Sequence, residues 1–135
     1  MAGKLVNEGR TYFGLVAVKN GTQRGANSWY LGLYLNTTEP LITATLASGL
    51  TELALTGYAR IQLNDVDWTN VLGVVTNILK TFTAGENWGD VYGYFVTDVA
   101  SGSGGDLIGV EHFSTGPFNI ANTKTLDVTA ELTII

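Results

Sequence analysis

The sequence predicts an all-β fold in which two antiparallel sheets pack face to face, as in a jelly roll or a Greek key. About eight short segments alternate apolar with polar residues and are separated by Gly, Asn and Pro turns. Helical spacing occurs once, near the N-terminus, and does not recur between the strands, which excludes a parallel α/β sheet. The length of 135 residues suits one domain, residues 1–135, with a continuous core.

Residues 87–98 are predicted to be an interior strand around which the others are arranged, because neither face suits exposure to water alone. One face carries Val91, Gly93 and Phe95, and the other carries Tyr92, Tyr94 and Val96. A strand that is apolar or aromatic on both sides needs cover on both sides.

Residues 7–19 predict the only helix. Asn7 suits the N-cap, Glu8 places negative charge in the first turn, and Asn20-Gly21 provides a stop. The side facing the sheet is expected to carry Tyr12, Leu15 and Val16. Ahead of the helix, residues 1–7 are a candidate arm reaching towards a neighbouring molecule.

A turn-rich connector, residues 20–27, leads to a strand at 28–36, and a second alternating strand is expected at 57–63. Between them the segment 45–55 is expected to cross irregularly. The first strand should direct Trp29, Leu31, Leu33 and Leu35 inwards and Tyr30, Gly32 and Tyr34 outwards. In the second, Ala59, Ile61 and Leu63 should point inwards, and Tyr58, Arg60 and Gln62 outwards.

Residues 64–68 are expected to form a turn before two short strands, 71–77 and 78–84. The apolar contributions of these two strands to the core are expected from Val74, Val75 and Phe82.

The C-terminal third predicts a surface loop at 99–105, a strand at 107–113, a turn at 122–124 and a last strand at 125–135. The last strand alternates strictly, so its aliphatic face must be buried inside the domain or against a partner. That face consists of Leu126, Val128, Ala130, Leu132 and Ile134.

Composition narrows the functional classes. The net charge is −5 and no cluster of Lys or Arg occurs, which argues against direct binding to nucleic acid. Only 14% of residues are charged, and Thr, Ser and Asn replace charge on the strands, as suits a surface covered by neighbours. The absence of Cys excludes disulfides and thiolate chemistry. No apolar run is as long as that of a signal peptide or a membrane span, so a soluble product made in the cytoplasm is expected.

Candidate chemical residues are few, and we expect no catalytic, cofactor-binding or metal-binding site. Glu111 and His112 are adjacent in a strand, so they point to opposite faces and do not cooperate as acid and base. We interpret His112 as a structural residue on the face of Ile108 and Val110. The oxygen-bearing residues Asn64, Asp65 and Asp67 lack the Gly and Glu of a calcium loop and are interpreted as a turn.

The aromatic residues allow two interpretations. They are core and subunit contacts, or they form a stacking platform for sugar rings. Trp29 is assigned to the core, whereas the pairs Tyr30/Tyr34 and Tyr92/Tyr94 remain open. The full set is Trp29, Trp68, Trp88, Tyr30, Tyr34, Tyr92 and Tyr94.

Five motifs, in this order and spread over nearly the whole chain, resemble those of small virion structural proteins of tailed bacteriophages. They are VNEG at 6–9, LGLYLNTTEP at 31–40, GYAR at 57–60, WGDVYGYFVTD at 88–98 and GPFNIAN at 116–122. The resemblance implies a β-sandwich protein of the virion without enzymatic activity. It carries no catalytic motif.

The most plausible role under this resemblance is capsid decoration: a cement protein on the outer shell that contacts the major capsid protein and copies of itself, as a homo-oligomer of two or three chains. The alternative is a jelly-roll module of the tail or fibre that binds a glycan receptor on the host surface. A small hydrolase is disfavoured because the sequence offers no nucleophile.

Overall fold

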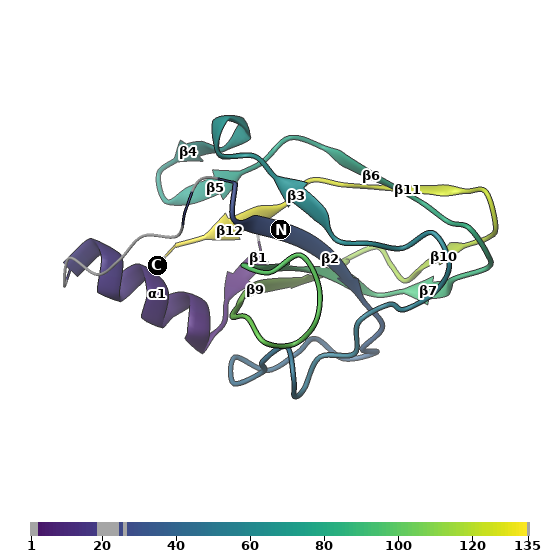
Figure 1. Cartoon of the computed structure of the whole chain (residues 1–135), viewed down its shortest axis with the longest axis horizontal. Helices are drawn as coiled ribbons and strands as arrows, with labels where there is room; N and C mark the ends of the chain where they lie inside the picture. The colour runs from purple at the N-terminus through teal and green to yellow at the C-terminus, as the bar shows by residue number, and fades with distance from the viewer. Residues whose placement is uncertain (1–2, 19–24, 26, 135) are drawn as a thin grey trace.

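The computed structural model describes residues 3–18, 25 and 27–134, and it confirms the predicted all-β, sandwich-like fold with one short helix, α1 (Asn7–Val18), near the N-terminus (Figure 1). Among these residues, no helix is long and apolar enough to cross a membrane. The helix was predicted for residues 7–19. Its proposed stop at Asn20-Gly21 and the side chains of Leu15 and Val16 lie outside the described residues.

Eight strands form the main sheet. They are β1 (Gly3–Leu5), β2 (Trp29–Tyr34), β3 (Ile61–Leu63), β4 (Thr69–Val71), β5 (Val74–Thr76), β8 (Gly93–Thr97), β9 (Leu107–His112) and β12 (Glu131–Thr133). Their order across the sheet is β3-β2-β8-β9-β1-β12-β5-β4. Neighbours are antiparallel except β1 and β12, which are parallel. Because β1 pairs with both β9 and β12, the suggestion of a free N-terminal arm is wrong for this segment.

Two two-stranded ribbons extend from this sheet towards the right of Figure 1. One pairs β6 (Lys80–Thr83) with β11 (Thr125–Val128), and the other pairs β7 (Gly89–Val91) with β10 (Phe118–Ile120). The main core contains side chains from the ribbons and from one face of the sheet, among them Leu31, Leu33, Phe82, Val91, Tyr94, Val96, Ile120, Leu126, Val128 and Leu132. The ribbons therefore provide the second layer of the sandwich.

The opposite face of the sheet carries a second, smaller core. Tyr34 of β2, Phe95 of β8 and Val110 of β9 pack there with Val6 and Leu107. The irregular crossing after β2, which contains residues 45–55 as predicted, supplies Ala44, Leu46 and Leu50 to this cluster. Strand β8 lies between β2 and β9 and is buried along its whole length, so the prediction of an interior strand is confirmed.

The predicted strand 87–98 is nevertheless two strands. Tyr92 separates β7 from β8, and the partner changes from β10 to β2 and β9. Val91 consequently packs in the main core with Tyr94, whereas Phe95 packs in the second core. The predicted pairing of Val91 and Phe95 on one face is wrong because the alternation restarts at this break.

The inward and outward assignments at 57–60 are also wrong. Only Ile61–Leu63 is a strand, because Gly57 adopts a positive φ of 87° and residues 58–60 do not pair in a sheet. Tyr58 therefore packs against the main core and Arg60 turns inwards, while Ala59 is exposed. Tyr34, expected outside, is fully buried in the second core.

The predicted strand 71–77 is in fact the second half of a hairpin. Strands β4 and β5 are joined by Leu72-Gly73, whose φ values of 51° and 83° are those of a type I′ turn. The next strand, β6, has its buried residue at Phe82 as predicted. The last segment is likewise two strands, β11 and β12, but its aliphatic face is buried inside the domain, with Ile134 partly buried.

One glycine explains how α1 lies so close to the sheet. A Cβ atom at Gly9 would collide with the backbone carbonyl of Ile108 in β9. The helix therefore tolerates the lower helical propensity of glycine because any side chain here would push it off the sheet.

Leu72 has a backbone conformation that is poorly suited to a leucine. It is fully exposed and occupies the left-handed region at a turn position that favours Asn, Asp or Gly. Leu72→Asn should therefore raise the free energy of unfolding by about 1 kcal/mol. Chemical denaturation measures this change, with the exposed Leu41→Asn as the control that should gain nothing. A lower stability for Leu72→Asn would contradict the strain assigned to this turn.

Candidate functional site

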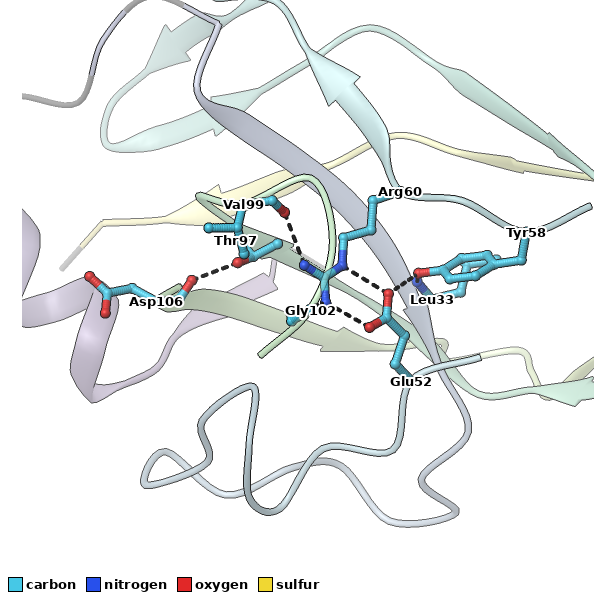
Figure 2. A network of polar contacts seen from close by, with 8 residues as sticks. All are labelled: Leu33, Glu52, Tyr58, Arg60, Thr97, Val99, Gly102 and Asp106. Atoms are coloured by element: carbon cyan, nitrogen blue, oxygen red, sulfur yellow. Dashed lines mark hydrogen bonds and ion pairs between the residues drawn. The ribbon is translucent and has the colours of Figure 1, made fainter. Parts of the chain in front are cut away.

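The most extensive polar cluster in the described residues is centred on Arg60 (Figure 2). Its Nε donates to Glu52 Oε1 at 2.8 Å, and its Nη2 donates to Glu52 Oε2 at 2.6 Å. The Arg60 side chain is only 3% exposed and lies over the ring of Phe95, 5.3 Å from its centroid. This two-pronged pairing matches the planar fork of a guanidinium to a carboxylate.

The same cluster ties together three segments that are distant in the sequence. Arg60 donates to the carbonyl oxygens of Val99 and Gly102, each at 2.9 Å, and so fixes the Gly- and Ser-rich loop 99–105. Tyr58 donates to Glu52 Oε1 at 2.7 Å and accepts from the Leu33 backbone N–H at 3.0 Å. The buried cation therefore holds the surface loop predicted at 99–105 to the sheet.

We call this cluster the clamp; it consists of Arg60, Glu52, Tyr58 and the carbonyl groups of Val99 and Gly102. The Arg60 nitrogens donate to a carboxylate and two carbonyl groups, and burial, followed by the hydrogen bond to Glu52, raises the pKa of Tyr58 above its usual value. A phenol with a raised pKa stays protonated and is a poor base. The arrangement therefore suits structural support better than proton transfer.

Removing Glu52 should be costly because it leaves the buried Arg60 cation without its counter-charge. Glu52→Gln is expected to lower the free energy of unfolding by about 3 kcal/mol. Because the two groups act as a unit, Glu52→Gln with Arg60→Met should cost less than the sum of the single changes. Equilibrium denaturation measures all three. As a control, Asp67→Asn removes a single ion pair with Lys80 at 3.6 Å, which lacks the two-point geometry of the Glu52–Arg60 pair, and should cost less than Glu52→Gln. Additive effects at Glu52 and Arg60 would contradict the clamp.

His112 lies in an aromatic stack on the face of the second core. Its Nδ1 is 3.0 Å from the Tyr34 hydroxyl, and its ring stacks with those of Tyr34 and Tyr92 at centroid distances of 5.9 and 6.0 Å. Glu111 points to the other face, as predicted. His112 does not share a face with Ile108, because the β8–β9 register shifts and Ile108 joins the main core while Val110 joins the second core.

Glu111 bonds to Tyr94 on the main-core face. The Tyr94 hydroxyl donates to Glu111 Oε2 and accepts from the Glu131 backbone N–H at 2.9 Å. Burial raises the pKa of the Glu111 carboxyl, and the hydrogen bond from Tyr94 offsets part of this rise. Burial likewise raises the pKa of Tyr94.

This raised pKa predicts a pH-dependent difference in stability. The folded state holds the Glu111 proton more tightly than the unfolded chain, so this stabilising contribution is full below the ordinary carboxyl pKa and is lost as pH rises through the raised one. Relative to Glu111→Gln, the native protein should therefore lose stability as pH rises above about 4, the ordinary range of a glutamate carboxyl.

Denaturation of both proteins at a series of pH values measures the effect. Glu86 is the matched control, because hydrogen bonds from Thr56 lower the pKa of its carboxyl. Because a lowered pKa has the opposite effect on the pH dependence, the native protein should lose stability relative to Glu86→Gln as pH falls. The same sign for both variants would contradict the burial argument.

The acidic turn is local structure, as predicted. Residues Asp65–Asp67 form a short 3₁₀ helix, η1. Asn64 Nδ2 donates to Asp67 Oδ2 at 3.3 Å, and Lys80 pairs with the same oxygen at 3.6 Å. Within the described part of the chain, no group of three His, Cys, Asp or Glu residues is placed to hold a metal ion.

The tyrosine pairs do not form the sugar platform considered from the sequence, because Tyr34 and Tyr94 are buried. Trp88 is also buried, and its Nε1 donates to the Thr56 carbonyl at 2.9 Å. Trp29 is only half-buried, so its assignment to the core is correct in part: it packs against the main core and also lines a cleft.

This cleft has a volume of about 280 Å³ and lies between α1 and the sheet. Sequence reasoning missed it, because Trp29 and Trp68 come together only through the fold. The helix contributes Tyr12 and Phe13, and the Trp29 ring lies 5.3 Å from that of Tyr12. The described lining residues are Tyr12, Phe13, Trp29, Trp68, Val75, Val96, Ile108, Leu132 and Ile134.

Comparison with known proteins gives no assignment: no protein-family model matches the chain, and no curated protein is significantly similar to it.

Proposed function

We propose that this protein is a structural component of a bacteriophage virion, most plausibly a capsid decoration protein located on the outer surface of the shell. Its partners would be the major capsid protein and copies of itself, without direct contact to nucleic acid or membrane. Five ordered motifs resemble those of small phage virion proteins, which supports the assignment to a virion. The role requires adhesion and no chemical step.

One structural observation carries the proposal: the described surface exposes eight large hydrophobic side chains, most of them close to one another in the sequence. Solvent reaches these residues in a domain with only 14% charged residues. Exposed apolar groups that gather near one another mark surfaces that partners cover. The residues are Leu41, Ile42, Leu55, Val66, Val71, Leu72, Ile78 and Leu79.

Seven of these eight residues, all except Leu55, lie in two parts of the chain. Leu41 and Ile42 lie in the crossing after β2, whereas Val66, Val71, Leu72, Ile78 and Leu79 lie around η1 and the β4–β5 hairpin. Two separate adhesive regions suit a protein that meets two kinds of neighbour, the shell protein and another copy of itself.

Binding of this kind would stabilise a shell by mass action. A protein that binds only the assembled lattice shifts the equilibrium towards that lattice. Repetition of one contact at many identical lattice sites multiplies a modest affinity into a large stabilisation of the whole particle.

The proposal is tested with purified capsid shells of the same phage that lack this protein. The native chain should sediment with expanded shells in a fixed ratio and raise the temperature at which they dissociate. Leu41→Asp should weaken sedimentation because it places a charge on an apolar contact, and Thr83→Asp, on an exposed polar position of β6 opposite Thr125, is the matched control. No sedimentation of the native chain with such shells would refute the decoration role.

The second candidate function is a tail or fibre module that binds a host glycan, and the aromatic cleft is the observation that favours it. Rings such as Trp29 and Trp68 can stack on sugars. However, the described lining contains no carboxylate or amide to bond sugar hydroxyl groups. A glycan array decides: specific binding that Trp29→Ala abolishes would support this candidate over decoration.

A further inference from the structure

The two edge strands of the eight-stranded sheet, β3 and β4, differ in their surroundings. At β3, Asn27 lies beside the edge: Gln62 Nε2 donates to the Asn27 carbonyl at 2.7 Å, and the Asp65 N–H donates to Asn27 Oδ1 at 2.9 Å. At the other end, β4 pairs only with β5 among the described residues, and all three of its residues are exposed.

The backbone of β4 leaves hydrogen-bonding groups on its outer side. Val71 and Val74 flank the two-residue turn and form the hydrogen-bonded pair that closes such a hairpin. Asn70 is therefore a non-hydrogen-bonded position of this hairpin, and its N–H and C=O point away from β5. Such groups are a template for another strand.

Apolar side chains lie at both ends of this edge. Val66, in η1 just before β4, is 92% exposed, and Leu72, just after β4, is fully exposed. Val71 is also exposed. The edge is thus short, polar at its centre and apolar at each end.

We propose that β4 pairs with β4 of a second copy of this chain, antiparallel about a twofold axis near Asn70. A twofold axis places the start of one strand beside the end of the other. With Asn70 opposite Asn70 of the second copy, Leu72 of each copy lies opposite Trp68 of its partner. The arrangement is self-complementary, because every apolar end meets an apolar end.

The absence of charge along this edge favours the approach of a second copy of this acidic protein. The chain carries a net charge of −5, but the segment from Trp68 to Leu79 contains no charged residue. Asp67, which precedes it, is paired with Lys80. Two copies therefore meet here without placing like charges opposite each other. The edge also lacks the Lys and Pro residues that protect sheet edges from pairing.

This inference deepens the self-contact in the proposed function and names its surface. The two remain separable, because dimerisation is measured in solution without shells, and shell binding is measured by sedimentation with shells. A chain that dimerises but does not bind shells would refute only the decoration role. A chain that binds shells but stays monomeric in solution would refute only the dimer.

Single cysteine substitutions give a direct test, because the native chain contains no Cys. Asn70→Cys in the full-length protein should form a disulfide-linked dimer under mild oxidation, since the two positions face each other across the axis. Gln62→Cys on the β3 edge and Ser101→Cys in an exposed loop are matched controls and should remain largely monomeric. Equal cross-linking at Gln62 or Ser101 would overturn the proposal.

Sedimentation equilibrium provides the second test. The native chain should dimerise in a concentration-dependent manner, and Leu72→Asn should weaken the dimer by about tenfold or more while leaving the fold intact. Asn70→Pro should have the same effect, because proline removes the outward N–H that the partner strand requires. A native chain that stays monomeric, or variants that dimerise as the native chain does, would overturn the proposal. If the native chain is monomeric and Leu72→Asn loses binding to shells, the β4 edge contacts the shell protein instead of a second copy.

Discussion

The burial of β8 on both faces is the constraint on which the rest of the structure depends. Tyr94 and Val96 face the main core, and Phe95 faces the second. Fully burying a side chain of this size stabilises the fold by about 1.5–3 kcal/mol, so each face must find its own cover. The ribbons cover one face, and the irregular crossing after β2 covers the other. Backbone hydrogen bonds from Leu35 N–H to the Thr51 carbonyl and from Leu53 N–H to the Leu33 carbonyl hold this crossing to the end of β2, and a buried ion pair adds a side-chain anchor.

Arg60 and Glu52 supply that anchor. A buried ion pair is not by itself a large source of stability, because both groups lose their hydration. Its effect here is geometric: Glu52 belongs to the crossing, Arg60 precedes β3, and the carbonyl acceptors belong to the loop after β8. Hydrophobic contacts alone would permit these segments to slide, whereas a forked guanidinium accepts one arrangement. The clamp therefore determines where loop 99–105 and the crossing lie on the sheet.

Alternation in the sequence was sufficient to predict the fold class, the interior position of β8 and the buried face of Leu126, Val128 and Leu132. It failed wherever the alternation was interrupted without a change in composition. Tyr92 interrupts β7 and β8, the Leu72-Gly73 turn contains no Asn or Asp, and residues 58–60 alternate without being in a strand. The cleft and the clamp escaped for another reason: both join residues that only the tertiary fold brings together. No local pattern in one sequence encodes such a meeting.

Buried polar groups and exposed apolar groups differ in whether they have partners within the protein. The buried polar groups of Arg60 and Tyr94 have hydrogen-bond partners, whereas Asn77 Oδ1 is buried without one among the described residues. Where the chain exposes apolar groups, as at Leu41 and Leu72, no partner within the described residues covers them. A leucine held in a left-handed turn costs stability in the isolated chain, and a favourable turn residue would remove that cost. The dimer proposed through β4 would supply a contact at Leu72 that forms only when another molecule is present, and such a contact would account for the residue at this position.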